Sequence, residues 1–381
     1  MKELPVVTDL ISESDLYKAT KEIFGFNVVS GLPCGELRHF IAEGSNDREI
    51  LHIGATNERE SVGIAQGAWL AGKKPVLYMQ NSGLFESSND LGSLLIPCKT
   101  SALFVVSWRG SPEENATQHL YTGAATIPLL DAFDLPYTAE PSESNLLKVK
   151  KEMESKGLPG VILVKRERFN DTPYVPSTCP AEKYESAIIS NEGKEIELAR
   201  EIALDTIFES LNAHDAVISS TGLISRSVFQ NHDANNQFYN AGAFGLTSAI
   251  GLGFAINKPN IRTVVIEGDG SVLTNLGLLN TIAHASPSNF VHIVLDNRVY
   301  ASCSGEKTFG SDVIPLVARD FGYKQIMVVQ TASGLKTAID RSDNGPTLID
   351  VQINTVGDRN FKRPLDMSNV AARFREKFSK I

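Results

Sequence analysis

The chain has 381 residues, which is enough for two domains with complete hydrophobic cores. Its hydrophobic content of 42% and charged content of 21% are ordinary for a globular protein, and its formal net charge of −9 argues against a nucleic-acid partner, since such surfaces need clustered Lys and Arg. We find no signal-peptide core and no apolar run of roughly 20 residues, so we expect a cytoplasmic protein with no membrane partner.

The cysteines argue against two further classes of protein. Cys34, Cys98, Cys179 and Cys303 are widely spaced and form no Cys-x-x-Cys pair. A zinc site and a disulfide framework are therefore both disfavoured.

Segments typical of strands and helices alternate through the first half of the chain. A run of small residues at 61–71 suits a close-packed helix. Short apolar runs predict strands at residues 26–30, 49–53, 75–79, 103–107 and 161–165.

A polar stretch containing Pro173, Pro176 and Pro180 has the composition of a linker, and the alternation resumes after it. The second half is predicted to contain helices at 196–211, 243–256, 271–284 and 370–378, and strands at 216–219, 264–266, 290–295 and 347–353. The fold class is therefore predicted to be α/β, with two doubly wound parallel-sheet domains. We place these domains at residues 1–170 and 195–381, joined by a linker at 171–194.

The second half also contains the strongest chemical pattern. The strand at 264–266 leads into Gly-Asp-Gly at 268–270, and the next strand ends at Asn297. Glycines allow a tight turn, and parallel strands end at one edge of a sheet, where such folds bind ligands. We therefore expect Asp269 and Asn297 to lie side by side, with Ser271 near a helix N-terminus. Oxygen ligands in this position suit Mg²⁺ bridging to a diphosphate.

This spacing resembles the cofactor motif of the thiamine-diphosphate-dependent enzymes. Their motif begins with Gly-Asp-Gly and ends, one strand–helix–strand unit later, in a pair that is commonly Asn-Asn and here is Asp-Asn. The resemblance implies that Asp269, Asn297 and the main-chain carbonyl of Val299 hold Mg²⁺. It also implies a pyrimidine-binding domain at 1–170 and a diphosphate-binding domain at 195–381, with no third domain between them.

Enzymes of this family need a glutamate beside the aminopyrimidine ring of the cofactor, and Glu58 in the Asn-Glu pair at 57–58 resembles it. A carboxyl group in an apolar pocket would hydrogen-bond a ring nitrogen and promote loss of the weakly acidic C2 proton of the thiazolium. Glu58 is thus the candidate catalytic residue. The alternative is a carboxylate that stabilises a helix start.

Short motifs over nearly the whole chain are similar, in order, to phosphonopyruvate decarboxylases. They lie at residues 31–34, 55–58, 79–84, 108–110, 118–119, 220–226, 242–245 and 363–364. The resemblance implies a homodimer or a dimer of dimers with active sites at the subunit interface. It also implies a cofactor-binding set, which comprises Asn57, Asn81, Ser82, Thr221, Gly222, Gly242, Phe244, Gly268, Asp269, Gly270, Ser271 and Asn297.

An anionic 2-keto acid substrate calls for fixed cations and N–H donors. Arg109 offers a planar fork, and His119 can donate a hydrogen bond or carry charge. A surface ion pair is the alternative interpretation of Arg109. Tyr300 and Ser302, which follow the metal-binding asparagine, complete the predicted substrate-binding set.

The leading hypothesis is a lyase of phosphonate metabolism, dependent on thiamine diphosphate and Mg²⁺, that decarboxylates 3-phosphonopyruvate to phosphonoacetaldehyde and CO₂. Three departures from the pattern keep related substrates open, of which one is Leu246 in place of a usual histidine. Tyr300 replaces a usual histidine and resembles sulfopyruvate decarboxylases, and Phe85-Glu86 replaces a usual Gly-Asn. A decarboxylase of sulfopyruvate, or of a related anionic 2-keto acid, is therefore the alternative.

Two other classes of protein have less support in the sequence. The altered loop at 300–304 motivates a non-catalytic paralogue that binds the cofactor. A nicotinamide-dependent dehydrogenase is disfavoured, because Gly251-Leu252-Gly253 falls within a helix-like segment and does not follow a strand.

Overall fold

The computed structural model describes residues 11–112, 114, 116–165, 187–190, 196 and 198–379. The chain divides into two compact units, one of residues 1–65 and 73–178 and the other of residues 66–72 and 179–381. Most of the predicted linker at 171–194 lies outside the described residues. Within the described ranges, no helix has the length and apolar character needed to cross a membrane.

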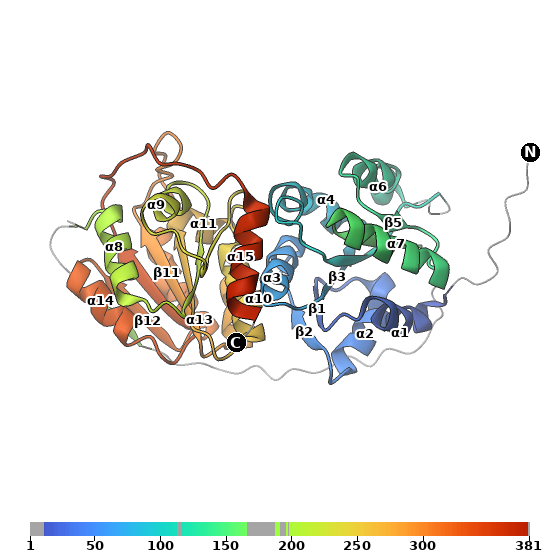
Figure 1. The fold of residues 1–381 in the computed structure, drawn as a ribbon, viewed down its shortest axis with the longest axis horizontal. Helices are drawn as coiled ribbons and strands as arrows, with labels where there is room; N and C mark the ends of the chain where they lie inside the picture. The colour runs from blue at the N-terminus through green and yellow to red at the C-terminus, as the bar shows by residue number, and fades with distance from the viewer. Residues whose placement is uncertain are drawn as a thin grey trace, which may run out of the picture. The chain divides into compact units, whose positions relative to one another are not determined.

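The first unit is built on a six-stranded parallel sheet with the order β2-β1-β3-β4-β6-β5 (Figure 1). Its strands are β1 (Val28–Gly31), β2 (Leu51–Gly54), β3 (Pro75–Gln80), β4 (Leu103–Ser107), β5 (Tyr137–Thr138) and β6 (Gly160–Val164). Its helices are α1 (Glu13–Phe24), α2 (Arg38–Asn46), α3 (Glu58–Leu70), α4 (Asn81–Glu86), α5 (Ser88–Asp90), the π-helical η2 (Leu91–Leu95), α6 (Leu120–Ala132) and α7 (Glu143–Lys156).

The core of the first unit forms where α1, α2 and α7 pack against one face of this sheet. Side chains of a strand alternate between its two faces, so every second strand residue belongs to this layer. The strand members include Val29, Val76, Tyr78, Leu103, Val105, Ile162 and Val164, and the helix members include Leu16, Tyr17, Phe40, Leu146 and Val149.

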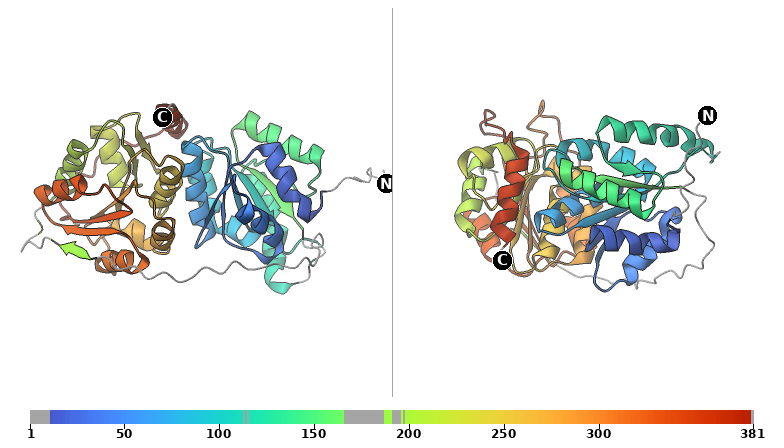
Figure 2. Two further views of the ribbon diagram at one scale, coloured as in Figure 1. Left: turned by 90° about the horizontal axis from the view of Figure 1, so that it is seen from below. Right: turned by 45° about the vertical axis from the view of Figure 1, so that its right-hand side comes forward.

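The second unit contains a seven-stranded parallel sheet with the order β7-β12-β13-β11-β10-β8-β9, and helices flank it on both sides (Figure 2). Its strands are β7 (Ile188–Ser190), β8 (Ala216–Ser219), β9 (Gln237–Tyr239), β10 (Thr263–Gly268), β11 (Phe290–Asp296), β12 (Gln325–Val329) and β13 (Thr347–Gln352). Its helices are α8 (Arg200–Ser210), α9 (Leu223–Asn231), α10 (Thr247–Asn257), α11 (Asp269–Thr274), α12 (Leu278–Ala285), α13 (Ile314–Phe321), α14 (Ala332–Asp340) and α15 (Met367–Ser379).

The predicted α/β class with two doubly wound parallel sheets is confirmed, and every strand predicted from an apolar run is present. Four strands have no counterpart in the prediction, namely β5, β7, β9 and β12. Of these, β7 lies inside the segment predicted to be a linker and pairs with β12.

Three predicted helices differ from those observed, and the helix expected at 196–211 begins at Arg200. The helix expected at 271–284 is divided into α11 and α12, because Asn275 and Gly277 have low helix propensity and the Asn275 side chain donates to the Gly245 carbonyl over 3.3 Å. The helix expected at 243–256 begins at Thr247, because Gly245 has φ +86° and lies outside the helical region. Gly251 lies inside α10, as its sequence context predicts.

The close packing of α10 against β10 can be tested at Gly251. A Cβ atom there would lie 2.2 Å from Cγ2 of Val265 on β10. We expect Gly251→Ala to destabilise the protein by about 1–3 kcal/mol despite its better helix propensity, measured by thermal or urea unfolding. Gly54→Ala, at a position where a Cβ meets no atom within 4 Å, is the matched control and should be close to neutral. Equal stabilities of the two variants would contradict the packing argument.

Candidate active site

The Gly-Asp-Gly turn at 268–270 places a carboxylate at the carboxyl edge of the second sheet. The chain passes from Gly268, at the end of β10, directly into α11, which begins at Asp269. Gly268 has an ordinary backbone conformation, with φ −88°. Gly270 is needed for space, because a Cβ there would lie 2.4 Å from Cε1 of Tyr300. The turn therefore allows the Tyr300 ring to lie against α11.

Strand pairing brings Asp269 and Asn297 together. β10 and β11 are parallel neighbours with Gly268 opposite Leu295, so the residues that follow both strands share one edge. Asp269, Asn297 and Val299 line a single cavity of about 80 Å³, which has room for several water-sized groups. All three residues predicted to hold the metal thus lie in one place.

Buried carboxylates gather at this edge. Asp269, Asp296 and Asp350 are each at most 2% exposed. Burial raises the pKa of Asp269 to about 7, and the nearby Asp296 carboxylate also acts to raise it. Burial and these two neighbours raise the pKa of Asp350 well above its usual range. Among the described residues, Oδ2 of Asp296 and Oδ1 of Asp350 have no hydrogen-bond partner. Such a cluster needs a cation or protons to offset its repulsion.

The oxygen atoms predicted to hold Mg²⁺ suit a hard divalent cation. Oδ1 of Asn297 accepts the Val299 N–H over 3.1 Å, and the Val299 carbonyl accepts the Ala301 N–H over 2.9 Å. Each oxygen keeps a second lone pair, and with Asp269 they form the mixed oxygen set that Mg²⁺ takes. No three His, Cys, Asp or Glu side chains of the described residues form a metal site by themselves. A metal here would therefore depend on the amide and main-chain oxygens.

The loop at 298–308 forms one wall of this cavity. An antiparallel bridge between Val299 and Lys307 joins its two ends. Tyr300 and Ser302 both line the cavity. The two predicted substrate-binding residues of the loop therefore share a cavity with the candidate metal ligands.

Two hydroxyl groups of the predicted cofactor-binding set have fixed orientations on the cavity wall. Thr221 donates to the Ala241 carbonyl over 2.8 Å, and Ser271 donates to Oε2 of Glu267 over 2.7 Å. Glu267 is fully buried, and its Oε1 lies 2.7 Å from Nε2 of the buried His292. Because both hydroxyl hydrogens are engaged, the two oxygens are left as acceptors.

Phe244 lines the same cavity, and its side chain is 37% exposed. The Gly242 carbonyl accepts the Phe244 N–H over 3.0 Å and so fixes the turn that carries the ring. Gly222 has φ +95°, which favours glycine, and forms the turn into α9. Neither glycine is among the described residues that line the cavity.

Arg200 lines this cavity without having been predicted from the sequence. It is the first residue of α8 and is only 7% exposed. In the sequence it occupies an unremarkable charged position of a helix, so no local signal marks it. The other lining residues for which the sequence predicted no role are mostly apolar. They include Leu223, Ile224, Leu295 and Ile353.

A second cavity, of about 290 Å³, lies in the first unit at the carboxyl end of its sheet. Glu58, Ser82 and Arg109 line it together with Gln80 and Cys34. The predicted catalytic glutamate and the predicted substrate-binding arginine therefore face one cavity.

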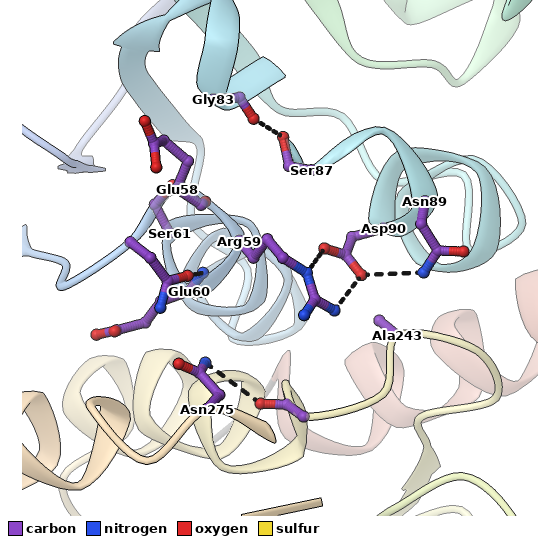
Figure 3. A network of polar contacts seen from close by, with 12 residues as sticks. Glu58, Arg59, Glu60, Ser61, Gly83, Ser87, Asn89, Asp90, Ala243 and Asn275 are labelled. Carbon is purple, nitrogen blue, oxygen red and sulfur yellow. Dashed lines mark hydrogen bonds and ion pairs between the residues drawn. The ribbon is translucent and has the colours of Figure 1, made fainter. Parts of the chain in front are cut away.

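Glu58 begins α3 and is 9% exposed. Burial raises its pKa, and the Glu86 carboxylate also acts to raise it. Its side chain lies close to Gly83, where a Cβ would be 2.1 Å from Cγ of Glu58. Figure 3 shows the Glu58 and Arg59 side chains leaving α3 in different directions, with Arg59 directed at Asp90. Gly83 thus gives the Glu58 side chain the space that it occupies.

The first turn of α3 is anchored on both sides of Glu58. Nε and Nη2 of Arg59 donate to the two carboxylate oxygens of the buried Asp90 over 2.8 and 3.0 Å (Figure 3). Oδ1 of Asn57 accepts the Glu60 N–H over 2.9 Å and so caps the helix start. Asn57, predicted to bind the cofactor, has this capping role in the structure.

Arg109 forms an ion pair with Glu114 that is largely buried, since the two side chains are 18% and 2% exposed. Its Nε and Nη2 donate to Oε1 of Glu114 over 2.9 and 2.6 Å, and the Glu36 carboxylate lies 3.8 Å from Nη1. Asn81 is fully buried and donates to the Arg109 carbonyl over 2.8 Å. Neither Asn81 nor His119 is among the described residues that line the cavity.

The pair of Arg109 and Glu114 predicts a pH-dependent contribution to stability. The guanidinium lowers the pKa of Glu114 from 4.5 to about 2. Because folding lowers this pKa, the contribution is fully present above pH 4.5 and is lost as the pH falls through about 2. As the pH falls from 4.5 to about 2, we expect the difference in unfolding free energy between the wild type and Glu114→Gln, measured by urea unfolding, to shrink. The exposed Glu154→Gln should show no such change, and a pH-independent difference for Glu114→Gln would contradict the pairing.

Comparison with known proteins relates the whole chain to decarboxylases. It is 32% identical to the phosphonopyruvate decarboxylase of Streptomyces hygroscopicus over 96% of this chain and 94% of that protein. It is 33% identical to the phosphonopyruvate decarboxylase of Streptomyces viridochromogenes over 92% and 91% of the two chains. A sulfopyruvate decarboxylase of Methanosarcina acetivorans is 28% identical over 74% and 75%.

Two further comparisons concern the cofactor and the fold. Residues 220–351 match the C-terminal TPP-binding domain of thiamine pyrophosphate enzymes. The crystal structure of benzoylformate decarboxylase from Polynucleobacter necessarius has the same fold, with a TM-score of 0.73 at 12% identity, covering 92% of this chain and 100% of that one. The chain therefore belongs to the thiamine-diphosphate-dependent enzymes, in which it is a carboxy-lyase of the phosphonopyruvate decarboxylase-like group.

Proposed function

We propose that this enzyme decarboxylates 3-phosphonopyruvate to phosphonoacetaldehyde and CO₂, with Mg²⁺ as the metal that accompanies thiamine diphosphate. The supporting observation is sequence identity of 32% and 33% to two proteins named phosphonopyruvate decarboxylase, over at least 91% of every chain compared. The sulfopyruvate decarboxylase of Methanosarcina acetivorans is less identical, at 28%, and covers 74% of the chain. Subunits of other sulfopyruvate decarboxylases are 34–38% identical, but each covers only 25–36% of the chain. The predicted homodimer or dimer of dimers is part of the proposal. The relatives that are named as alpha or beta subunits belong to assemblies of more than one chain.

The residues of the chain divide the work between the two cavities. When bound, thiamine diphosphate supplies the carbon nucleophile and the electron sink for loss of CO₂. Asp269, Asn297 and the Val299 carbonyl would hold Mg²⁺ at the diphosphate. Glu58, whose pKa burial raises, would hold a proton at its carboxyl group and share it with a pyrimidine nitrogen.

Arg109 is the proposed contact for the anionic end of the substrate. Glu114 occupies its Nε and Nη2 edge, which leaves the Nη1 side for a ligand. An anion that approaches Nη1 would have to displace or bridge the Glu36 carboxylate, 3.8 Å away. The pocket would therefore discriminate by charge as well as by shape.

Turnover of a panel of keto acids tests the substrate. Purified enzyme with thiamine diphosphate and Mg²⁺ should release CO₂ from phosphonopyruvate with a higher kcat/KM than from sulfopyruvate or pyruvate. Tyr300, which lines the cavity of the second unit, supports sulfopyruvate as the second candidate. A preference for sulfopyruvate would overturn the proposal, and cofactor binding without turnover of any keto acid would favour a non-catalytic paralogue.

Glu58→Gln should separate cofactor binding from cofactor activation. We expect hydrogen–deuterium exchange at C2 of bound thiamine diphosphate, followed by NMR, to slow by about 100-fold or more, because a general acid–base contributes at least this factor. The affinity for the cofactor, measured by calorimetry, should change little.

Gly83→Ala provides a second route to the same effect without altering any ionisable group. The new methyl would displace the Glu58 side chain, so exchange at C2 should slow here as well. Normal exchange in both variants would refute the role of Glu58.

Asp269→Asn should abolish the metal dependence of cofactor binding. We expect the affinity for thiamine diphosphate at saturating Mg²⁺ to fall by more than about 100-fold, since losing a supporting group alone costs 10–100-fold. Asp340→Asn is the control, because it removes an exposed carboxylate of α14 that is not among the described residues lining this cavity. If Asp269→Asn bound the cofactor like the wild type, the metal assignment would be wrong.

A further inference from the structure

Arg200 has no assigned role, yet it lines the cavity that contains the candidate metal ligands. Among the described residues that form this wall, it is the one with a positively charged side chain. Its side chain is 8% exposed, although arginines are rarely buried unless paired. The position of this cation therefore needs a physical explanation.

Contacts within the chain hold one edge of the Arg200 guanidinium. Nε and Nη2 donate to Oε1 of Glu201 over 3.1 and 2.5 Å, and Nη2 also donates to the Asp358 carbonyl. The guanidinium carbon lies 5.6 Å from the centroid of the Phe361 ring. These contacts fix the orientation of the guanidinium plane.

The same contacts leave the other edge available. Nη1 of Arg200 donates to no other residue in the part of the chain that the structure describes. Glu201 is also an incomplete counterion, because its side chain is 28% exposed and its charge is screened by water. An oriented arginine with unused donors in a cavity is the arrangement that receives an anion, especially a tetrahedral oxyanion.

The surroundings of Arg200 suit an oxyanion at this place. Ser220, Thr221 and Ser302 line the same cavity and supply polar atoms near the cation. Asp269 also lines it, and its carboxylate would repel an anion unless a divalent cation lies between them. Arg200 and a metal at Asp269 would then approach the anion from two sides.

We propose that Arg200 is an oxyanion-binding residue of this cavity. Two groups have the required chemistry, which are the terminal phosphate of the thiamine diphosphate and the phosphonate or sulfonate group of the substrate. The second source rests on the proposed function, whereas the first does not.

Binding measurements on Arg200→Gln and Arg200→Lys distinguish these sources without turnover. Calorimetry would use thiamine diphosphate with Mg²⁺ as one probe, and phosphonoacetate added to the loaded enzyme as the other. We expect Arg200→Gln to weaken one probe by about 10- to 100-fold, the loss typical of a charge-assisted hydrogen bond. Arg200→Lys, which keeps the charge but loses the fork, should recover only part of this loss.

Each outcome has a defined meaning. Weaker thiamine diphosphate binding assigns Arg200 to the terminal phosphate, and weaker phosphonoacetate binding alone assigns it to the substrate anion. Unchanged affinity for both probes in a folded Arg200→Gln protein overturns the proposal. Arg319→Gln, on the exposed side of α13, is the matched control for loss of one positive charge and should bind both probes like the wild type. Should Arg200→Gln fail to fold, Arg200→Lys carries the test, and wild-type affinities for both probes would then overturn the proposal.

Discussion

The parallel pairing of β10 with β11 is the constraint on which the cavity of the second unit depends. Because the two strands end at one edge, Asp269, Asp296 and Asn297 are held together. A slip of one residue in this register would turn every side chain of one strand to the opposite face. Both strands are buried apolar runs, so the packing of the core fixes the register and thereby the positions of the carboxylates.

The two cavities balance charge in different ways. In the first unit the cation and a carboxylate of the chain pair directly, because Glu114 contacts the Nε and Nη2 edge of Arg109. In the second unit Asp269 has a like charge, Asp296, as its neighbour and receives a neutral hydroxyl from Thr308. A site of the second kind favours a bound cation, because burial prevents water from screening the carboxylates.

Features carried by short runs of residues, or by one strand–helix–strand unit, could be predicted, whereas features that depend on more distant segments could not. The strands, and the meeting of Asp269 with Asn297, follow from apolar runs and the polar residues that end them. Arg200 meets the Asp358 carbonyl from 158 positions away, and no pattern in α8 reveals this contact. The need for glycine at position 83 is apparent only in the structure, where the Glu58 side chain lies against it. Short strands such as β5, β7 and β9 carry too few residues for a clear pattern.

The contact of Thr308 with Asp269 joins the loop at 298–308 to the carboxylate. A ligand that takes Oδ2 of Asp269 must therefore share or replace this hydroxyl. Loop stability and ligand binding at Asp269 are therefore coupled. If a ligand at Asp269 changes the stability of the loop by some factor, a change in loop stability alters the ligand affinity by the same factor. Substitutions at 300–304 can then change the affinity of the site for its ligand without any change in the protein atoms that contact the ligand.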